Sequence, residues 1–143
     1  MAITQAMATS FKVQLLNGQH NFSANTFKLA LYTSSATINE NTTAYSASNE
    51  VPSTGNYSAG GNTLSVSVTP TNTGNVAFIS FTNSSWANAT ITANGALIYN
   101  ANLANAAVAV LAFGGDKTST NGTFAVNFPT ADASNAIIRL TAS

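Results

Sequence analysis

The spacing of hydrophobic positions changes after the first sixteen residues of the chain. From Ile3 to Leu15, apolar side chains recur at every fourth position, which is the spacing of one face of a helix. Gly18 follows, and a glycine just beyond the last periodic residue is a common helix end. The pattern therefore predicts one short helix, over residues 4–16.

After this segment the apolar positions follow a period of two, which is typical of β-strands. In the segment 27–32 the odd-numbered positions are Phe and Leu, so we expect Lys28, Ala30 and Tyr32 to face solvent. The strands expected from alternation or from denser apolar runs cover residues 27–32, 64–68, 76–81, 89–100, 106–113, 123–128 and 136–140.

Glycine and asparagine mark the expected turns between these strands. The strand over residues 89–100 is interrupted at Asn94-Gly95, either by a bulge or by a tight turn. The sequence Gly114-Gly115-Asp116-Lys117 is typical of a hairpin connection and lacks the spacing of a phosphate-binding loop. Further turns are expected at Gly60-Gly61, Gly74 and Asn121-Gly122.

Strands that follow one another without intervening helices favour antiparallel packing over a parallel α/β fold. We expect a mainly β fold: an antiparallel β-sandwich or jelly roll with one short N-terminal helix. The length fits a single domain, residues 1–143. The expected core consists of Phe11, Leu15, Phe27, Leu29, Leu31, Leu64, Val66, Phe78, Phe81, Leu97, Val108, Val110, Leu111, Phe124, Phe128, Ile137 and Leu140.

One long segment, residues 34–62, contains no convincing strand. A loop of this length within a compact domain is usually functional or packed against a partner. It nevertheless contains Tyr45, Val51 and Tyr57, which are poor side chains for a loop in solvent. We therefore expect a neighbouring subunit to order this loop by contact with these residues.

Charged side chains are scarce, with four Lys or Arg and four Asp or Glu. They make up 6% of the chain, against roughly 25% in an average soluble domain. Asn, Ser and Thr supply 55 of the 143 residues, so hydroxyls and amides must form the surface. Four cations cannot make a basic stripe, which excludes a nucleic-acid binder that works by neutralising phosphates. The apolar runs are too short to span a bilayer, and we expect no membrane partner.

Residues suited to catalysis or metal binding are also few, because the chain has no cysteine and one histidine, His20. A Ser-His-Asp triad would depend on His20, for which a solvated turn position is the simpler interpretation. Glu40 and Glu50 share the long loop, so no spacing fixes them as a carboxylate pair. We interpret the acidic residues as solubilising. We expect no catalytic, metal-binding or cofactor-binding residue, no cofactor, and hence a protein that is not an enzyme.

Aromatic side chains offer a different possibility, because exposed rings can stack on sugars. Trp86 follows the strand over residues 76–81, a position typical of an aromatic residue at the edge of a core. Packing is therefore the commoner explanation for these rings. The candidates for stacking are Trp86, Tyr32, Tyr45, Tyr57 and Tyr99.

Several stretches resemble a family of small virion proteins of tailed bacteriophages. These are FKLALYTSSATINENTTAYSASNEV (Phe27 to Val51) and ATITANGALIYNANLANAAVAVLAFGGDK (Ala89 to Lys117). The opening MAITQAMATSFKVQLLNGQHNF and the later FAVNFPTADASNAIIRL extend the resemblance over almost the whole chain. The resemblance implies a non-enzymatic structural protein of the virion, made in the cytoplasm of the host bacterium.

Within that family the expected role is a capsid decoration (cement) protein, which binds and stabilises the shell of major capsid protein. The alternative is a tail, neck or fibre component that contacts glycans of the host surface. Either role implies other virion proteins as partners, and a net charge of zero favours a homo-oligomer. A carbohydrate-active enzyme is the least favoured hypothesis, because the sequence shows no carboxylate pair at a fixed spacing.

Partner contacts are expected along a neutral strand edge as well as in the long loop. The segment Thr63 to Thr69 has no lysine to block pairing with another chain, so it is a natural template for an added strand. The expected contact residues are Tyr45, Val51, Tyr57, Leu64 and Val66.

Overall fold

The computed structural model describes residues 2–141, and most of their regular structure is β-strand. Strands make up 50% of the chain and helix 6%. Every pair of neighbouring named strands is antiparallel. The structure thus confirms the expected fold class, a mainly β, sandwich-like fold with one short helix.

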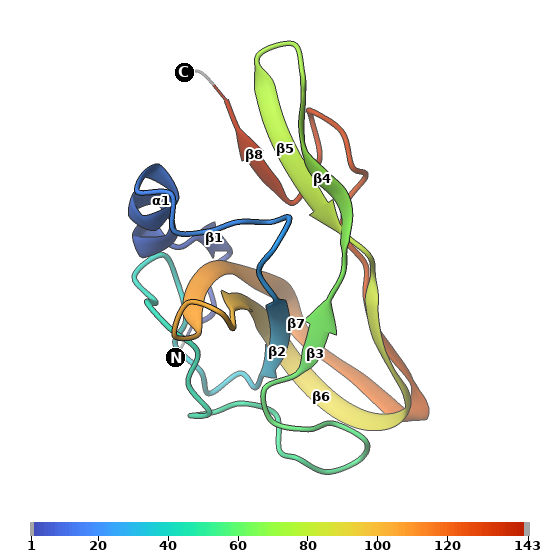
Figure 1. Ribbon diagram of the computed structural model, residues 1–143. Coiled ribbons are helices and arrows are strands. Elements are labelled where there is room, and N and C mark those ends of the chain that lie inside the picture. Colours follow the sequence, from blue (N-terminus) through green and yellow to red (C-terminus); the bar gives the residue numbers. More distant parts are fainter. Residues whose placement is uncertain (1, 142–143) are drawn as a thin grey trace.

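The strands form two sheets (Figure 1). The five-stranded sheet has, in spatial order, β1 (Ala6–Met7), β7 (Ala106–Val126), β6 (Ser84–Asn100), β2 (Phe27–Tyr32) and β3 (Asn62–Leu64). The three-stranded sheet has the order β4 (Val66–Thr73), β5 (Val76–Phe81) and β8 (Ile138–Leu140). This smaller sheet stands at one end of the molecule, with helix α1 (Thr9–Leu16) beside β8.

The N-terminal helix is shorter than predicted. Helix α1 begins at Thr9, and the preceding β1 pairs with β7 instead, Ala6 opposite Val110. The four-residue apolar spacing predicted too early a start for the helix, because residues 6–7 pair with the edge of β7 and form a strand. Gly18 does follow the helix end as predicted: its φ is +70°, and its N–H donates to the carbonyl of Leu15.

Strand β2 has the predicted bounds but not the predicted solvent-facing side. Ala30 and Tyr32 are buried, with exposed fractions of 0% and 1%, and Lys28 is half-buried. The reason is that the long loop covers the face that alternation assigned to solvent. Residues 49–51 also line the edge of β2, since Val51 N–H donates to the carbonyl of Leu31.

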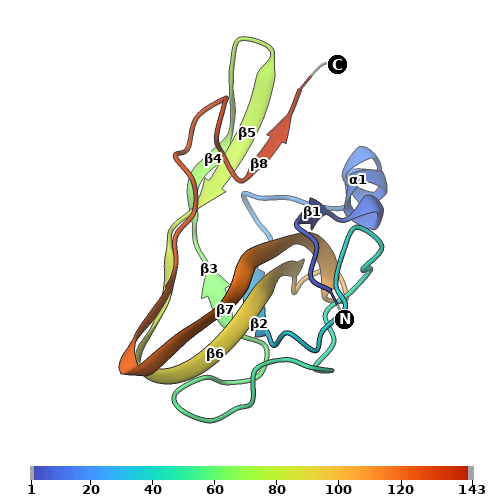
Figure 2. The ribbon, with the colours of Figure 1, turned by 180° about the vertical axis from the view of Figure 1, so that it is seen from behind.

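Strands β6 and β7 form a long hairpin, where the sequence predicted three separate strands and a Gly-Gly turn. The prediction of a turn at Gly114-Gly115 is wrong, because both glycines lie inside β7. Ala112 pairs with Gly95 and Lys117 with Ala93, so four residues of β7 lie opposite Asn94 alone. The bulge therefore lies in β7 opposite Asn94, and β6 continues through Asn94-Gly95, where the sequence predicted an interruption. Figures 1 and 2 show that the hairpin bends sharply, so that its two halves converge.

The segment predicted as one strand over residues 64–68 is divided between the two sheets. Leu64 ends β3, and Val66 begins β4 after a break at Ser65. Strand β5 has the predicted bounds, and the predicted turn at Gly74 connects it to β4. This division places residues 64–66 at the junction of the sheets.

Most of the predicted core is buried. Four of its members, Leu15, Val66, Phe128 and Ile137, are only partly buried. The assignment of Leu140 to the core is wrong, because half of its surface is exposed. The large buried side chains that the prediction missed are Phe22, Tyr32, Ile38, Val51, Tyr57, Ile79, Trp86, Ile91, Ile98, Tyr99, Val126 and Ile138.

Candidate functional site

The long loop is folded against its own chain, although it contributes no named strand before Asn62. Isolated bridges tie it to three distant places: Ile38 pairs with Ile3, Ala44 with Ala106, and Glu50 with Tyr32. The loop thus contacts the N-terminal segment, the start of β7 and β2. Contacts within the chain therefore hold the loop, and its contact with a neighbouring subunit stays a prediction.

A buried carboxylate, Glu50, holds the central part of this loop. The Tyr45 hydroxyl donates to Oε1 at 2.6 Å and the Tyr57 hydroxyl donates to Oε2 at 2.6 Å. The N–H of Gly60 also donates to Oε2, at 2.7 Å. Only 8% of Glu50 is exposed, so these three bonds replace most of the water that a carboxylate would otherwise bind.

All four tyrosines of the chain surround this carboxylate. Tyr32 donates to the carbonyl of Ser46 at 2.6 Å, and Tyr99 donates to that of Gly60 at 2.7 Å. Burial and the negative charge of Glu50 raise the pKa of Tyr99 to about 12. The pKa values of the other three tyrosines rise for the same reasons, burial being the largest cause. The hydroxyls therefore stay protonated and continue to donate at neutral pH.

The structure brings three of the five predicted contact residues together and leaves two elsewhere. Tyr45, Val51 and Tyr57 lie around Glu50, and the last two are buried. Leu64 is also buried, and it and the half-buried Val66 lie where the two sheets meet. Packing within the chain accounts for the apolar character of these residues, and their contact with a partner stays a prediction.

The strand edge predicted as a template for a partner is less open than the sequence suggested. Asn62 donates from Nδ2 to Ser84 Oγ at 3.1 Å and to the carbonyl of Ser85 at 3.0 Å, so the start of β6 lies next to β3. Strand β4 does form a sheet edge, but its register shifts twice and it contains Pro70. Bulges and proline are features that protect an edge from pairing.

His20 is buried, which contradicts its interpretation as a solvated histidine. Its Nε2 lies 2.8 Å from Gln14 Oε1, and its Nδ1 lies 3.1 Å from Nδ2 of Asn100. The ring packs edge-on against Phe11, at 4.8 Å between ring centroids. Burial lowers the pKa of His20. Both ring nitrogens are thus occupied in linking the helix to the end of β6.

The aromatic candidates for sugar stacking are mostly core residues. Trp86, Tyr32, Tyr57 and Tyr99 are buried, which confirms packing as their role in the fold. Trp86 lies against Tyr57, with ring centroids 5.7 Å apart. Tyr45 is partly buried, and its ring stacks on Tyr99 at 4.8 Å.

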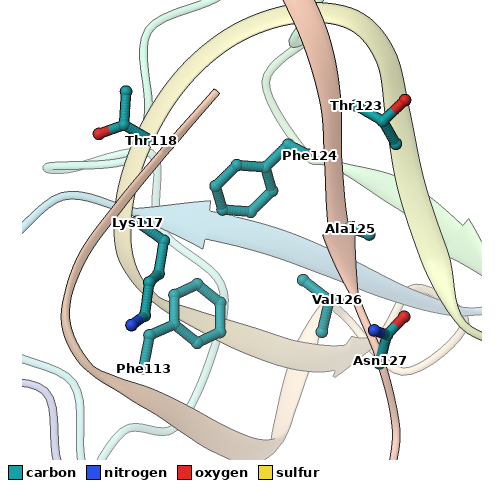
Figure 3. Close-up of a pocket in the computed structure, with 8 residues that line it drawn as sticks. All are labelled: Phe113, Lys117, Thr118, Thr123, Phe124, Ala125, Val126 and Asn127. Carbon is teal, nitrogen blue, oxygen red and sulfur yellow. The ribbon is translucent and has the colours of Figure 1, made fainter. Parts of the chain in front are cut away.

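A hollow of about 400 Å³ lies inside the bend of β7 (Figure 3). Phe113 and Phe124 belong to opposite halves of the strand, yet their ring centroids are 6.3 Å apart. A straight strand of eleven residues would separate them by roughly 36 Å. Lys117 is the only charged residue among those that line the hollow, which are Phe113, Lys117, Thr118, Thr123, Phe124, Ala125, Val126 and Asn127.

The sequence reasoning missed Glu50 and His20 as internal polar groups. The signal for Glu50 was its position between Tyr45 and Tyr57, with Gly60 three residues after Tyr57. The spacing did not show that these residues converge. For His20 the sequence carried no such signal, because its partner Asn100 is eighty residues away.

Within residues 2–141, no helix is long and apolar enough to cross a membrane. In the same part of the chain, no group of three or more His, Cys, Asp or Glu side chains could hold a metal ion. No protein-family model, no curated protein and no solved structure matches the chain.

Proposed function

We propose that this chain is a non-enzymatic structural component of a bacteriophage virion, a capsid decoration protein that binds the shell of major capsid protein. The observation that carries the proposal is the absence of charge from residues 51–115. This stretch contains the whole of β3, β4, β5 and β6. A surface built from it can form contacts only through hydrogen bonds and apolar packing.

Hydroxyl and amide side chains suit a permanent contact in a lattice. Threonine, serine and asparagine lose less conformational entropy than lysine or glutamate when they are immobilised. Strand β4 presents such side chains to solvent over most of its length. A net charge of zero also removes the long-range repulsion that keeps copies of a protein apart.

The buried ionisable groups support a structural role. Glu50 accepts three hydrogen bonds from its own chain, and both ring nitrogens of His20 are occupied. A general base needs a nitrogen or oxygen atom that is free to accept a proton from the substrate. These two groups instead hold the loop and the helix in place.

A tail, neck or fibre component is the second candidate, and the hollow in the bend of β7 favours it. Two phenylalanine rings, a lysine and two threonines line this hollow. Aromatic faces beside polar side chains can hold a small ligand such as a sugar of the host surface. In this role the protein would be present in few copies.

The test is the copy number of the chain in purified particles of the phage whose genome encodes it. Quantitative mass spectrometry against the major capsid protein measures this number. Hundreds of copies per particle support a decoration protein, and a few to tens support a tail or fibre component. Absence of the chain from particles overturns both.

A further inference from the structure

An apolar groove of about 290 Å³ lies between helix α1 and the three-stranded sheet. None of the residues that line it is an acid, a lysine or an arginine. They are Leu15, Gly18, His20, Asn21, Phe22, Pro70, Ala77, Phe78, Ile79, Ile138 and Leu140. The groove is therefore suited to uncharged, apolar side chains.

A large hydrophobic side chain is exposed in the groove itself. Leu140 lines the groove and is 50% exposed. Covering a leucine that is exposed beside an apolar groove lowers the free energy, so such a surface is suited to binding a partner.

The groove runs beside the free edge of a strand. Strand β8 is the last in its sheet and pairs with β5 alone among the described strands. Figures 1 and 2 both show it between β5 and α1. Its side chains alternate: Ile138 and Leu140 line the groove, whereas Arg139 lines a hollow on the other face.

We propose that this groove and the edge of β8 bind an extended segment of a partner protein, which joins the small sheet as a fourth strand. The segment places aliphatic side chains in the groove at alternate positions and an acidic side chain opposite Arg139. This contact deepens the proposed structural role and rests on it. Added strands gain affinity from backbone hydrogen bonds and specificity from pockets for alternate side chains.

The charge distribution selects this occupant over a second copy of the chain. Two β8 strands paired about a twofold axis centred on Arg139 would place two arginines opposite each other, which is destabilising. The outer edge of β4 is a poor strand donor, because of its two register shifts and Pro70. A segment from another protein with a carboxylate at the central position has neither disadvantage.

The proposal is tested by nuclear magnetic resonance of the purified chain with a peptide blocked at both ends, Thr-Val-Thr-Val-Glu-Val-Thr-Val-Thr. We expect saturable shifts at Leu15, Phe22 and Phe78, and slower amide exchange in β8. A peptide with lysine in place of its glutamate should bind about two- to five-fold more weakly. With Arg139→Glu this preference should reverse.

Two exposed alanines in strands provide a matched pair of variants. Ala77→Phe fills the groove, so we expect at least tenfold weaker peptide binding. Ala125 lies in β7, outside the groove, so the Ala125→Phe variant should bind the peptide as the wild type does. Far-UV circular dichroism and thermal melting verify that both variants fold.

Three results would overturn the proposal: no saturable shifts, shifts at β4 instead of β8, or equal binding by both alanine variants. Self-association that protects β8 without peptide would also overturn it, by assigning the surface to a second copy. The assay uses purified chain, so it can fail while the protein is still found in particles. Failure here is thus distinct from failure of the proposed function.

Discussion

Asn100, the last residue of β6, donates a hydrogen bond from its side-chain amide to Nδ1 of His20 at 3.1 Å. The orientation of this amide is fixed by its other bonds: its oxygen accepts from the N–H of Asn102, and Nδ2 also donates to Asn25. Nδ1 of His20 must therefore accept, and Nε2 carries the proton that is donated to Gln14. This arrangement accommodates only the neutral imidazole.

Stability is expected to fall on mild acidification because of this histidine. Burial lowers the pKa of His20 below its ordinary value of 6.5, so the unfolded chain binds the proton more readily than the folded one. The free energy of unfolding should thus decrease as pH falls below about 6.5. Denaturant titrations between pH 5 and 8 measure the effect.

The control for this prediction is His20→Phe, which keeps a ring but cannot titrate. This variant should be less stable at every pH, with a flat profile over the same window. The carboxyl of Asp132 has a pKa lowered by hydrogen bonds from Asn135 and Ser134, and it titrates below that window. An equal slope in the wild type and His20→Phe would contradict the assignment.

Glu50→Gln should destabilise the protein by about 1–3 kcal/mol, because a glutamine amide would direct its own N–H groups at donors that need an acceptor. The N–H of Gly60 cannot reverse its role. The matched control is Glu40→Gln in the same loop, where the side chain is exposed and a change within about 0.5 kcal/mol is expected. Chemical denaturation of both variants measures the difference. Similar losses in both would show that Glu50 is not the anchor of the loop.

Two glycines with left-handed backbones should respond very differently to alanine. At Gly61, φ is +75° and an added Cβ would overlap the carbonyl oxygen of Leu29 in β2. At Gly74, φ is +58° but the space around it is open. Gly74→Ala should cost about 1–2 kcal/mol, for the backbone alone. Gly61→Ala should cost clearly more or prevent folding, as soluble yield and thermal melting would show.

If the chain is a virion component, salt should not remove it from particles. Contacts made by hydroxyls, amides and apolar groups depend weakly on ionic strength, whereas charge-driven contacts weaken as salt screens them. Particles washed in about 1 M salt, where the Debye length is roughly 3 Å, should retain the protein. Stepwise release with rising salt would show that its few charges hold it in place.

The sequence predicted the strands whose pattern is local. Strands β2 and β5 have the expected bounds, since a run such as Phe27 to Tyr32 needs no distant information. The burial of both faces of β2 was not predictable, because a loop without periodicity covers one of them. Alternation shows which residues could face solvent, and it does not show what else packs there.

The β6–β7 hairpin marks another limit of local reasoning. Gly114-Gly115 suits either a turn or a bulge, because both need the positive φ angles that glycine allows. A bulge forms instead of a turn because β6 continues to pair with β7 on both sides of the glycines. That register depends on contacts between distant residues.

The candidate surfaces were predicted least well. The sequence indicated that Tyr45, Val51 and Tyr57 are unusual for a loop. In the structure, Tyr45 and Tyr57 donate to Glu50, and Val51 is buried beside β2. The groove beside β8 escaped notice because Leu140 was assigned to the core. A strand pattern does not distinguish a buried apolar position from one at an uncovered edge.

Strand β2 is synthesised before either strand that pairs with it in the sheet. Residues 95–100 of β6 and 62–64 of β3 both follow it in the chain. During synthesis, β2 therefore leaves the ribosome before its pairing strands have been made. Strands β6 and β7 are adjacent in sequence and can pair as soon as both are made. A chain truncated before Asn100 has an incomplete sheet for β2 to join.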